Sequence, residues 1–235
     1  MPSRADVETL QAANRGLVAL ARRDLRAFWS TLDLTRPERA RDLLLEFMPA
    51  LVEQYGEAAA TVAADFYDDL RAAERAPGRF SARMADVVSV DRVQARTRFA
   101  AQHLFTETPS QMLTFLTGAA TKYVLEPGRA TIVQSAAADP AASGWHRETR
   151  PSEAYASGCD FCRMLVGRGG VYKDSTVRFA AHDDCHCVAL PSWDANAPEV
   201  DAMAYVASQR TSAMSPAQRE RHNARVRDWI AADAD

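Results

Sequence analysis

Five residues that can bind a soft metal ion are gathered between positions 159 and 187. They follow the pattern C-x2-C, then H-x2-C-x-C, and comprise Cys159, Cys162, His182, Cys185 and Cys187. A CxxC pair on a tight turn points two thiolates at one ion, and a second group of thiolate and imidazole ligands completes a tetrahedron. The chain has 4 cysteines in all, so every cysteine belongs to this cluster. The pattern predicts one closed structural zinc site, built by four of these five residues.

Four other chemistries could use the same residues. A disulfide pair is typical of small secreted domains, and a redox CxxC is typical of a βαβ setting that the sequence does not show. A cysteine nucleophile would need His182 as its base and Asp183 or Asp184 to orient that base. A catalytic zinc would keep one position open to water, whereas here the protein can supply every ligand. The clustered thiols favour structural metal binding over each of these.

The composition is that of an ordinary globular protein. Of the 235 residues, 47% are hydrophobic and 25% are charged, and the formal net charge is −3. This charge gives no general argument for nucleic-acid binding, which usually needs a basic domain. The polar N-terminal residues lack the apolar core of a signal peptide, and no apolar stretch is long enough to cross a bilayer. We therefore expect a soluble protein that is made in a cytosol and has no membrane partner.

Helical periodicity dominates the first part of the chain. Apolar residues recur at helical spacing from Ser3, a candidate cap, to Phe28. A second helix is expected to begin at a capping box of Thr35 and Glu38 and to extend to the Pro-Gly turn that follows residue 76. Pro49 should kink or restart this helix, because proline removes a donor and clashes with the preceding turn. The pattern thus predicts two long amphipathic helices.

Three shorter helices are predicted next, over 91–105, 110–124 and 129–138, with a turn at 126–128 between the last two. Their apolar stripes are broad enough to pack on one another. Residues 1–140 are therefore predicted to form a helical region, part of which docks on another chain.

The composition changes after residue 140, and residues 145–193 are predicted to form a small zinc-stabilised domain. Trp145 is interpreted as a core anchor where this domain meets the helices. Residues 194–235 are predicted to be a polar linker and a final helix, which opens at the capping box Ser215-Pro216-x-Gln218. The predicted fold class is therefore mainly α, with a helical N-terminal region, a small zinc-stabilised α+β domain and a C-terminal helix. Short β-prone pieces of that domain lie at 171–172, 176–179 and 188–190.

Four motifs of the second region are distinctive as a set. They are Gly144-Trp145-His146-Arg147, Cys159-Asp160-Phe161-Cys162-Arg163-Met164-Leu165, Arg168-Gly169-Gly170-Val171-Tyr172 and His182-Asp183-Asp184-Cys185-His186-Cys187. Together they resemble the C-terminal region of MuF-type phage minor head proteins, in particular those of actinobacteriophages. The H-x2-C-x-C element is the specific part of the resemblance. Where this chain has the Asp183-Asp184 pair, that family often has a proline or a small residue.

The resemblance implies a structural minor capsid protein that acts in phage head morphogenesis. Its partners would be the portal protein, the major capsid protein or both, with packaged DNA as a further contact. It would be made in the host cytoplasm and located in the virion, inside the capsid near the portal. The alternatives are a capsid maturation protease and a DNA-contacting zinc module. Because no G-x-S-x-G nucleophile turn or comparable constellation is present, we expect no enzymatic activity.

Overall fold

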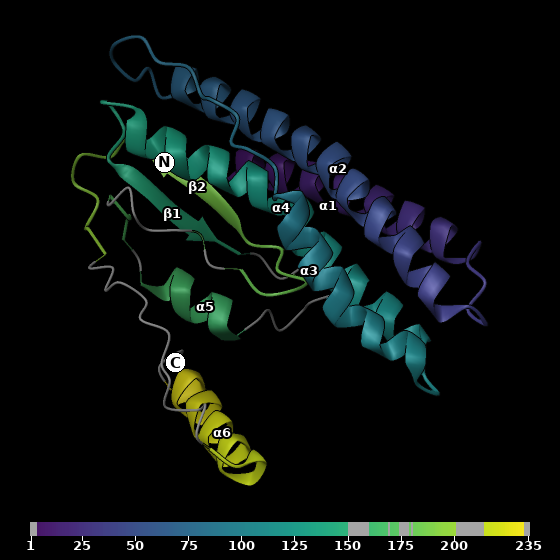
Figure 1. Cartoon of the computed structure of the whole chain (residues 1–235). Coiled ribbons are helices and arrows are strands. Elements are labelled where there is room, and N and C mark those ends of the chain that lie inside the picture. The colour runs from purple at the N-terminus through teal and green to yellow at the C-terminus, as the bar shows by residue number, and fades with distance from the viewer. Residues whose placement is uncertain are drawn as a thin grey trace.

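The computed structural model of the chain describes residues 4–149, 160–168, 170–173, 179, 181–200 and 214–232. The elements of this part are α1 (Arg4–Trp29), α2 (Pro37–Ala73), α3 (Val90–Ala101), the 3-10 helix η1 (Gln102–Phe105), α4 (Ser110–Ala138), β1 (Gly144–Glu148), α5 (Asp160–Gly167), β2 (Val188–Ser192) and α6 (Pro216–Ala232). Figure 1 shows a helical body with one small two-stranded sheet. The predicted mainly α fold class is thus confirmed. No helix in the described ranges is both long and apolar enough to cross a membrane.

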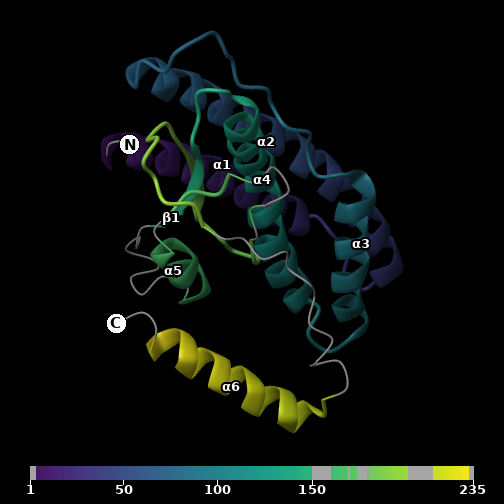
Figure 2. The same ribbon diagram turned by 90° about the vertical axis from the view of Figure 1, so that its left-hand side faces the viewer.

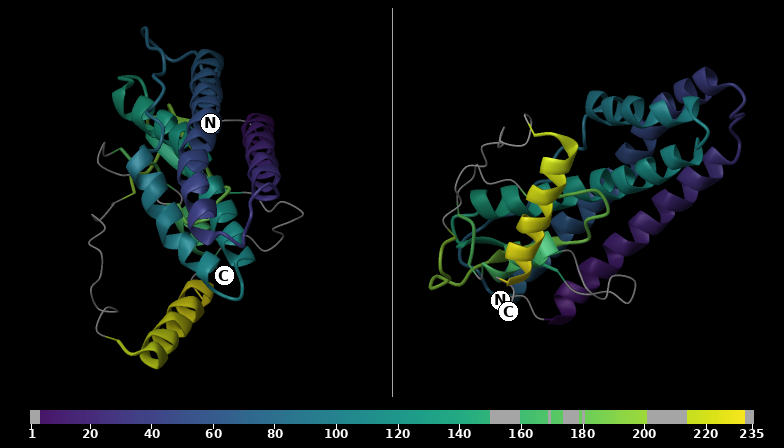
Figure 3. Two further views of the ribbon diagram at one scale, coloured as in Figure 1. Left: turned by 45° about the vertical axis from the view of Figure 1, so that its right-hand side comes forward. Right: turned by 90° about the horizontal axis from the view of Figure 1, so that it is seen from below.

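Helices α1 to α4 pack into a bundle around a shared apolar cluster. α2 contacts α1, α3 and α4, and α1 also contacts α4; Figure 3 shows α1 and α2 side by side, joined by a short connection. The apolar stripe of each helix faces this cluster, because burial of those side chains is what stabilises an amphipathic helix in a protein. Fully buried members include Leu25 of α1, Leu44 of α2, Val93 of α3 and Leu116 of α4.

Glycine lets α2 and α4 approach each other closely. A Cβ atom on Gly128 of α4 would lie 2.7 Å from the carbonyl oxygen of Ala59, and one on Gly56 of α2 would lie 3.3 Å from Cγ of Pro127. The two helices therefore meet backbone to backbone at this point. This contact fixes the position of the α4 residues that follow it.

Both long helices continue through a proline. α2 contains Pro49, so the restart predicted there does not occur, and α4 contains Pro127, so the turn predicted at 126–128 is wrong. A proline inside a helix costs roughly 3 kcal/mol, but the neighbouring apolar residues Met48, Leu51 and Leu125 are buried in the core. Burial of several such side chains outweighs one missing backbone hydrogen bond.

The predicted capping box at Thr35 and Glu38 is also wrong. Asp33 Oδ1 accepts hydrogen bonds from both the backbone nitrogen and the hydroxyl of Thr35, at 3.0 and 2.6 Å. α2 then begins at Pro37, whose fixed backbone angle suits the first helical position. The aspartate turn competes successfully for the threonine side chain. The box predicted at the start of α6 is confirmed, since Ser215 N donates to Gln218 Oε1 and Gln218 N donates to Ser215 Oγ.

Strands β1 and β2 form an antiparallel pair that packs on α4. Their register pairs Gly144 with Ser192 and Glu148 with Val188, and both strands contact α4. Figure 1 shows α5 on the side of the sheet opposite α4, and Figure 2 shows α6 outside the bundle, beyond α5, which it contacts. Strand β2 confirms the β-prone piece at 188–190. β1 and α5 were not predicted, and the piece at 176–179 lies almost wholly outside the described residues.

A second apolar cluster joins the sheet to the helices. Trp145 of β1 is 3% exposed, stacks on Tyr172 and shares this cluster with Leu10 of α1 and Ile132 of α4. The interpretation of Trp145 as a core anchor is therefore confirmed. The division into regions 1–140, 145–193 and 194–235 stays a prediction.

Asp139 ties the end of α4 to α2 and to the segment after β2. Its carboxylate accepts hydrogen bonds from Arg71 Nε at 2.9 Å, Trp193 Nε1 at 3.1 Å and the Tyr67 hydroxyl at 3.2 Å. The Asp139 side chain is fully buried, so these donors replace the water that the charge has lost. Asp139, which directly follows the last helix predicted before residue 140, is therefore a buried residue that links three segments of the structure.

Candidate metal centre

Three donor atoms from two segments meet at the predicted metal site. They belong to Cys162 on α5 and to His182 and Cys185 on the loop before β2, and all lie within 4.8 Å of one another. Cys162 Sγ is 3.4 Å from His182 Nε2 and 3.9 Å from Cys185 Sγ. Cys162 of the C-x2-C motif is therefore brought together with His182 and Cys185 of the H-x2-C-x-C motif, as the sequence predicts. Cys162 lies in a helix and not on a tight turn.

The spacing of these donors fits a tetrahedral zinc ion. With Zn–S bonds of about 2.3 Å and Zn–N bonds of about 2.0 Å, the edges of the tetrahedron are about 3.8 Å between two sulfurs and about 3.5 Å between sulfur and nitrogen. The distances of 3.9 and 3.4 Å are close to both values. Two soft thiols and an imidazole are also the donor types that zinc prefers. This group can hold a metal ion.

The remaining candidates differ in position. Cys187 is 2% exposed and lies in the same buried cluster as Cys162 and Cys185, but it is not one of the three mutually close donors. Cys159 lies outside the described residues. His186, between Cys185 and Cys187, is not part of the group. A fourth thiol, that of Cys187, is therefore close to the three donors.

The imidazole of His182 is oriented by the backbone. Its Nδ1 lies 2.6 Å from the carbonyl oxygen of Asp183, which can only accept a hydrogen bond. The proton is therefore on Nδ1, and the Nε2 lone pair faces Cys162. Metal-binding histidines are typically held in this way by an outer hydrogen bond, which fixes the tautomer and the ring orientation.

The two aspartates beside His182 hold the loop against the helical bundle. Asp183 pairs with Arg96 of α3, and Asp184 pairs with Arg22 of α1. Arg22 also donates to Thr121 Oγ1 of α4 at 2.8 Å. These pairs give the unusual Asp183-Asp184 sequence a structural reason. They also engage the carboxylates that a cysteine–histidine nucleophile would require to orient its base.

The backbone at Asp184 places the same loop on α4. Its N–H donates to the carbonyl oxygen of Gly118 at 3.3 Å, and its φ of 61° lies in the left-handed region. Aspartate tolerates that region better than most residues. A Cβ atom on Gly118 would lie 3.0 Å from Asp184 Oδ2, so this glycine makes room for the loop. Three helices of the bundle thus contact the segment that carries His182 and Cys185.

The cysteine cluster is buried, and its thiols shift the pKa of one another. Cys162 and Cys185 are 2% and 1% exposed. Hydrogen bonds from Cys162 and Cys187, helped by the positive charge of Arg129, lower the pKa of Cys185. The same hydrogen bonding to Cys185 and Cys187, together with burial, raises the pKa of Cys162. A thiol with a lowered pKa ionises more readily, and the thiolate is the form that binds a metal ion.

Arg129 of α4 is a member of the site that the sequence analysis did not find. Its Nε donates to the carbonyl oxygen of Cys187 at 2.9 Å, and its Nη2 donates to that of Cys185 at 2.5 Å. Burial lowers the pKa of Arg129, while the sulfurs of Cys185 and Cys187 raise it. No local signal marks this residue, because an arginine in an amphipathic helix is usually exposed.

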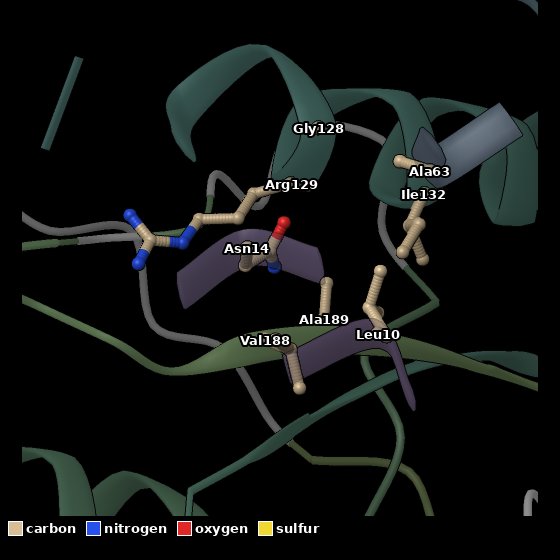
Figure 4. A pocket seen from close by; sticks show the side chains of 8 residues that line it. All are labelled: Leu10, Asn14, Ala63, Gly128, Arg129, Ile132, Val188 and Ala189. Atoms are coloured by element: carbon tan, nitrogen blue, oxygen red, sulfur yellow. The ribbon is translucent and has the colours of Figure 1, made fainter. Parts of the chain in front are cut away.

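A small pocket lies beside Arg129 and has no room for a substrate. Its volume is about 10 Å³, and Leu10, Ile132 and Val188 are among its lining residues. A space of this size admits about one water molecule. In Figure 4 the Arg129 guanidinium extends away from Leu10 and Ile132, so the charged group lies outside the apolar part of the pocket.

The class of protein follows from comparison with known families. The fold is a helical bundle, and a buried cluster of cysteine and histidine side chains packed against it forms a candidate structural metal site. The chain belongs to the VG15 protein family, whose model matches residues 1–210. This is a family of viral gene proteins, so the chain is a phage structural or virion-related protein. No curated protein and no solved structure gives a significant match.

Proposed function

We propose that the chain is a minor capsid protein of a phage head, of the MuF type, that docks on the portal protein inside the capsid. The observation that carries this proposal is the VG15 family match over residues 1–210. The long amphipathic helices support the proposal, because they pack into one bundle around a shared apolar core. A minor capsid protein of this type acts by binding its partners, not by catalysis. The buried cysteine cluster, whose loop is held against the bundle, suits such a structural role.

The test uses the full-length chain in the cognate phage. A tagged chain should be present in purified particles in few copies, and it should be absent from heads assembled without portal protein. Absence from complete particles refutes the proposal. Equal amounts in heads with and without portal protein would place the docking on the major capsid protein instead.

We propose further that the ion is a structural Zn²⁺, bound by Cys162, His182 and Cys185 together with Cys187 or Cys159. When bound, the ion would join α5 to the loop before β2 and stabilise this part of the chain. The purified protein should then contain about one zinc per chain, and C162S and C185S should each abolish it. Of C159S and C187S, the variant that releases zinc identifies the fourth ligand. A zinc-free protein with two disulfides among its four cysteines refutes the metal site.

The proposed role includes no catalysis. The thiols of the cluster are almost completely buried, and the carboxylates beside His182 are engaged by arginines of the bundle. Incubation with the major capsid protein of the same phage should give no cleaved product. Cleavage that disappears in H182A, in a protein that still folds and binds zinc, would replace the structural role by a capsid maturation protease.

A further inference from the structure

A buried positive charge lies beside the cysteine cluster. Arg129 is 4% exposed, and no carboxylate in the described part of the chain forms an ion pair with it. Its Nη1 atom is buried and has no hydrogen-bond partner among the described residues. Arginine stays protonated in proteins, and an uncompensated buried charge costs several kcal/mol. A negative charge must therefore lie close to Arg129 in the functional protein.

The cysteine cluster is the source of that charge. Arg129 donates to the backbone of Cys185 and Cys187, whose thiols share one buried cluster with the thiol of Cys162. A Zn²⁺ ion with three thiolates and one neutral imidazole has a net charge of −1, because the thiolates contribute −3 and the ion +2. One guanidinium balances this charge. The same sum holds whether the third thiolate belongs to Cys187 or to Cys159.

The geometry of Arg129 also orders the ligand segment. Its two hydrogen bonds reach the carbonyl oxygens of Cys185 and Cys187, on either side of His186. A planar guanidinium can donate to both at once, whereas an ammonium group on a flexible stem provides no such fork. The Phe179 ring lies 5.0 Å from the guanidinium carbon and covers it. The side chain thus fixes the backbone that carries the sulfur ligands.

Helix α4 is tightly packed directly before Arg129. Gly128, the preceding residue, packs against the Ala59 backbone of α2. The guanidinium is therefore held at a set position relative to the bundle, and the ligand loop is held by the guanidinium.

From these observations we propose that Arg129 is a positioning residue for the metal centre, which it orders through Cys185 and Cys187 and whose net negative charge it balances. This role rests on the metal site proposed above. It predicts a centre with three thiolates and one imidazole, since two thiolates would leave the guanidinium uncompensated.

The experiment compares zinc affinity among full-length variants, by competition with a chromophoric chelator at fixed pH. R129M removes both charge and fork, and R129K keeps the charge alone. Removing an outer partner of a metal ligand typically costs about 10- to 100-fold in affinity, so we expect such a loss in R129M and a smaller one in R129K. R92M is the matched control, because Arg92 also contacts α4, through Glu126, without touching the cysteines. It should bind zinc like the wild type.

A merely structural role gives a different result. R129M would then unfold more easily both with and without zinc, and its zinc affinity would stay within twofold of the wild type, which overturns the proposal. The Co²⁺-substituted absorption spectrum is a second measure, and it should change in both Arg129 variants but not in R92M. If R129M does not fold, R129K decides alone: wild-type affinity and spectrum in R129K refute the positioning role. A wild-type chain that binds no zinc refutes the metal site itself, and this role with it.

Discussion

The space around two helical glycines, Gly16 of α1 and Gly128 of α4, predicts opposite effects for their replacement by alanine. In G16A the new Cβ, on the exposed face of α1, meets no atom within 4 Å, so only helix propensity changes. Alanine is better than glycine in a helix interior by about 0.8–1.0 kcal/mol. In G128A the new Cβ would lie 2.7 Å from the Ala59 carbonyl oxygen. Overpacking of this kind costs about 1–3 kcal/mol, which equals or exceeds the propensity gain.

The two variants should therefore separate in stability. For a chain of this size, 1 kcal/mol corresponds to about 2–4 °C in Tm, so G16A should raise Tm by a few degrees and G128A should lower it by up to several degrees. Thermal unfolding followed by circular dichroism, with urea unfolding at 25 °C as a second measure, tests this. If G128A stabilises the protein as much as G16A does, α2 and α4 do not meet backbone to backbone, and the account of this contact is wrong.

Two further predictions concern buried polar groups. R71M leaves the buried Asp139 carboxylate without its cation, so it should lower the free energy of unfolding, measured in urea, by about 3 kcal/mol. R92M breaks the exposed pair with Glu126 and should lower the same free energy by at most about 1 kcal/mol. Equal losses in the two variants would contradict this prediction. Burial lowers the pKa of His146, so below about pH 6.5 the unfolded chain binds a proton that the folded chain does not. The free energy of unfolding should then fall as pH falls from about 6.5 toward the folded-state pKa of His146. H146Q should flatten this pH dependence of stability. An unchanged pH profile in H146Q would exclude His146 as the source of the dependence.

The features that the sequence determines are those set by neighbours along the chain. Helical spacing of apolar residues predicts α1 and α3, and the Ser215 and Gln218 side chains close the cap of α6 within four residues. The candidate metal donors are also determined by the local sequence, because their residue types and spacing favour a shared ion. The structure confirms that Cys162, His182 and Cys185 meet.

Other features depend on contacts between distant segments, which local patterns do not encode. The sequence around Pro127 predicts a turn, yet α4 continues through this residue because α2 packs against α4 there. Strand β1 contains a glycine and three polar residues in five positions, so its sequence gives no strand pattern, and it is defined by its pairing with β2. In each case the packing of another element outweighs the local preference.

The surroundings of the candidate metal centre were decided by tertiary structure alone. Asp183 and Asp184 look like solvated charges in the sequence, but they pair with Arg96 and Arg22 from helices far away along the chain. Arg129 looks like an exposed helix residue, but the packing of α2, α4 and β2 buries it against the carbonyls of the cysteine loop. The sequence therefore determined which side chains can bind the ion. The tertiary structure decided which charges surround them, because burial and ion pairing arise only when distant segments come together.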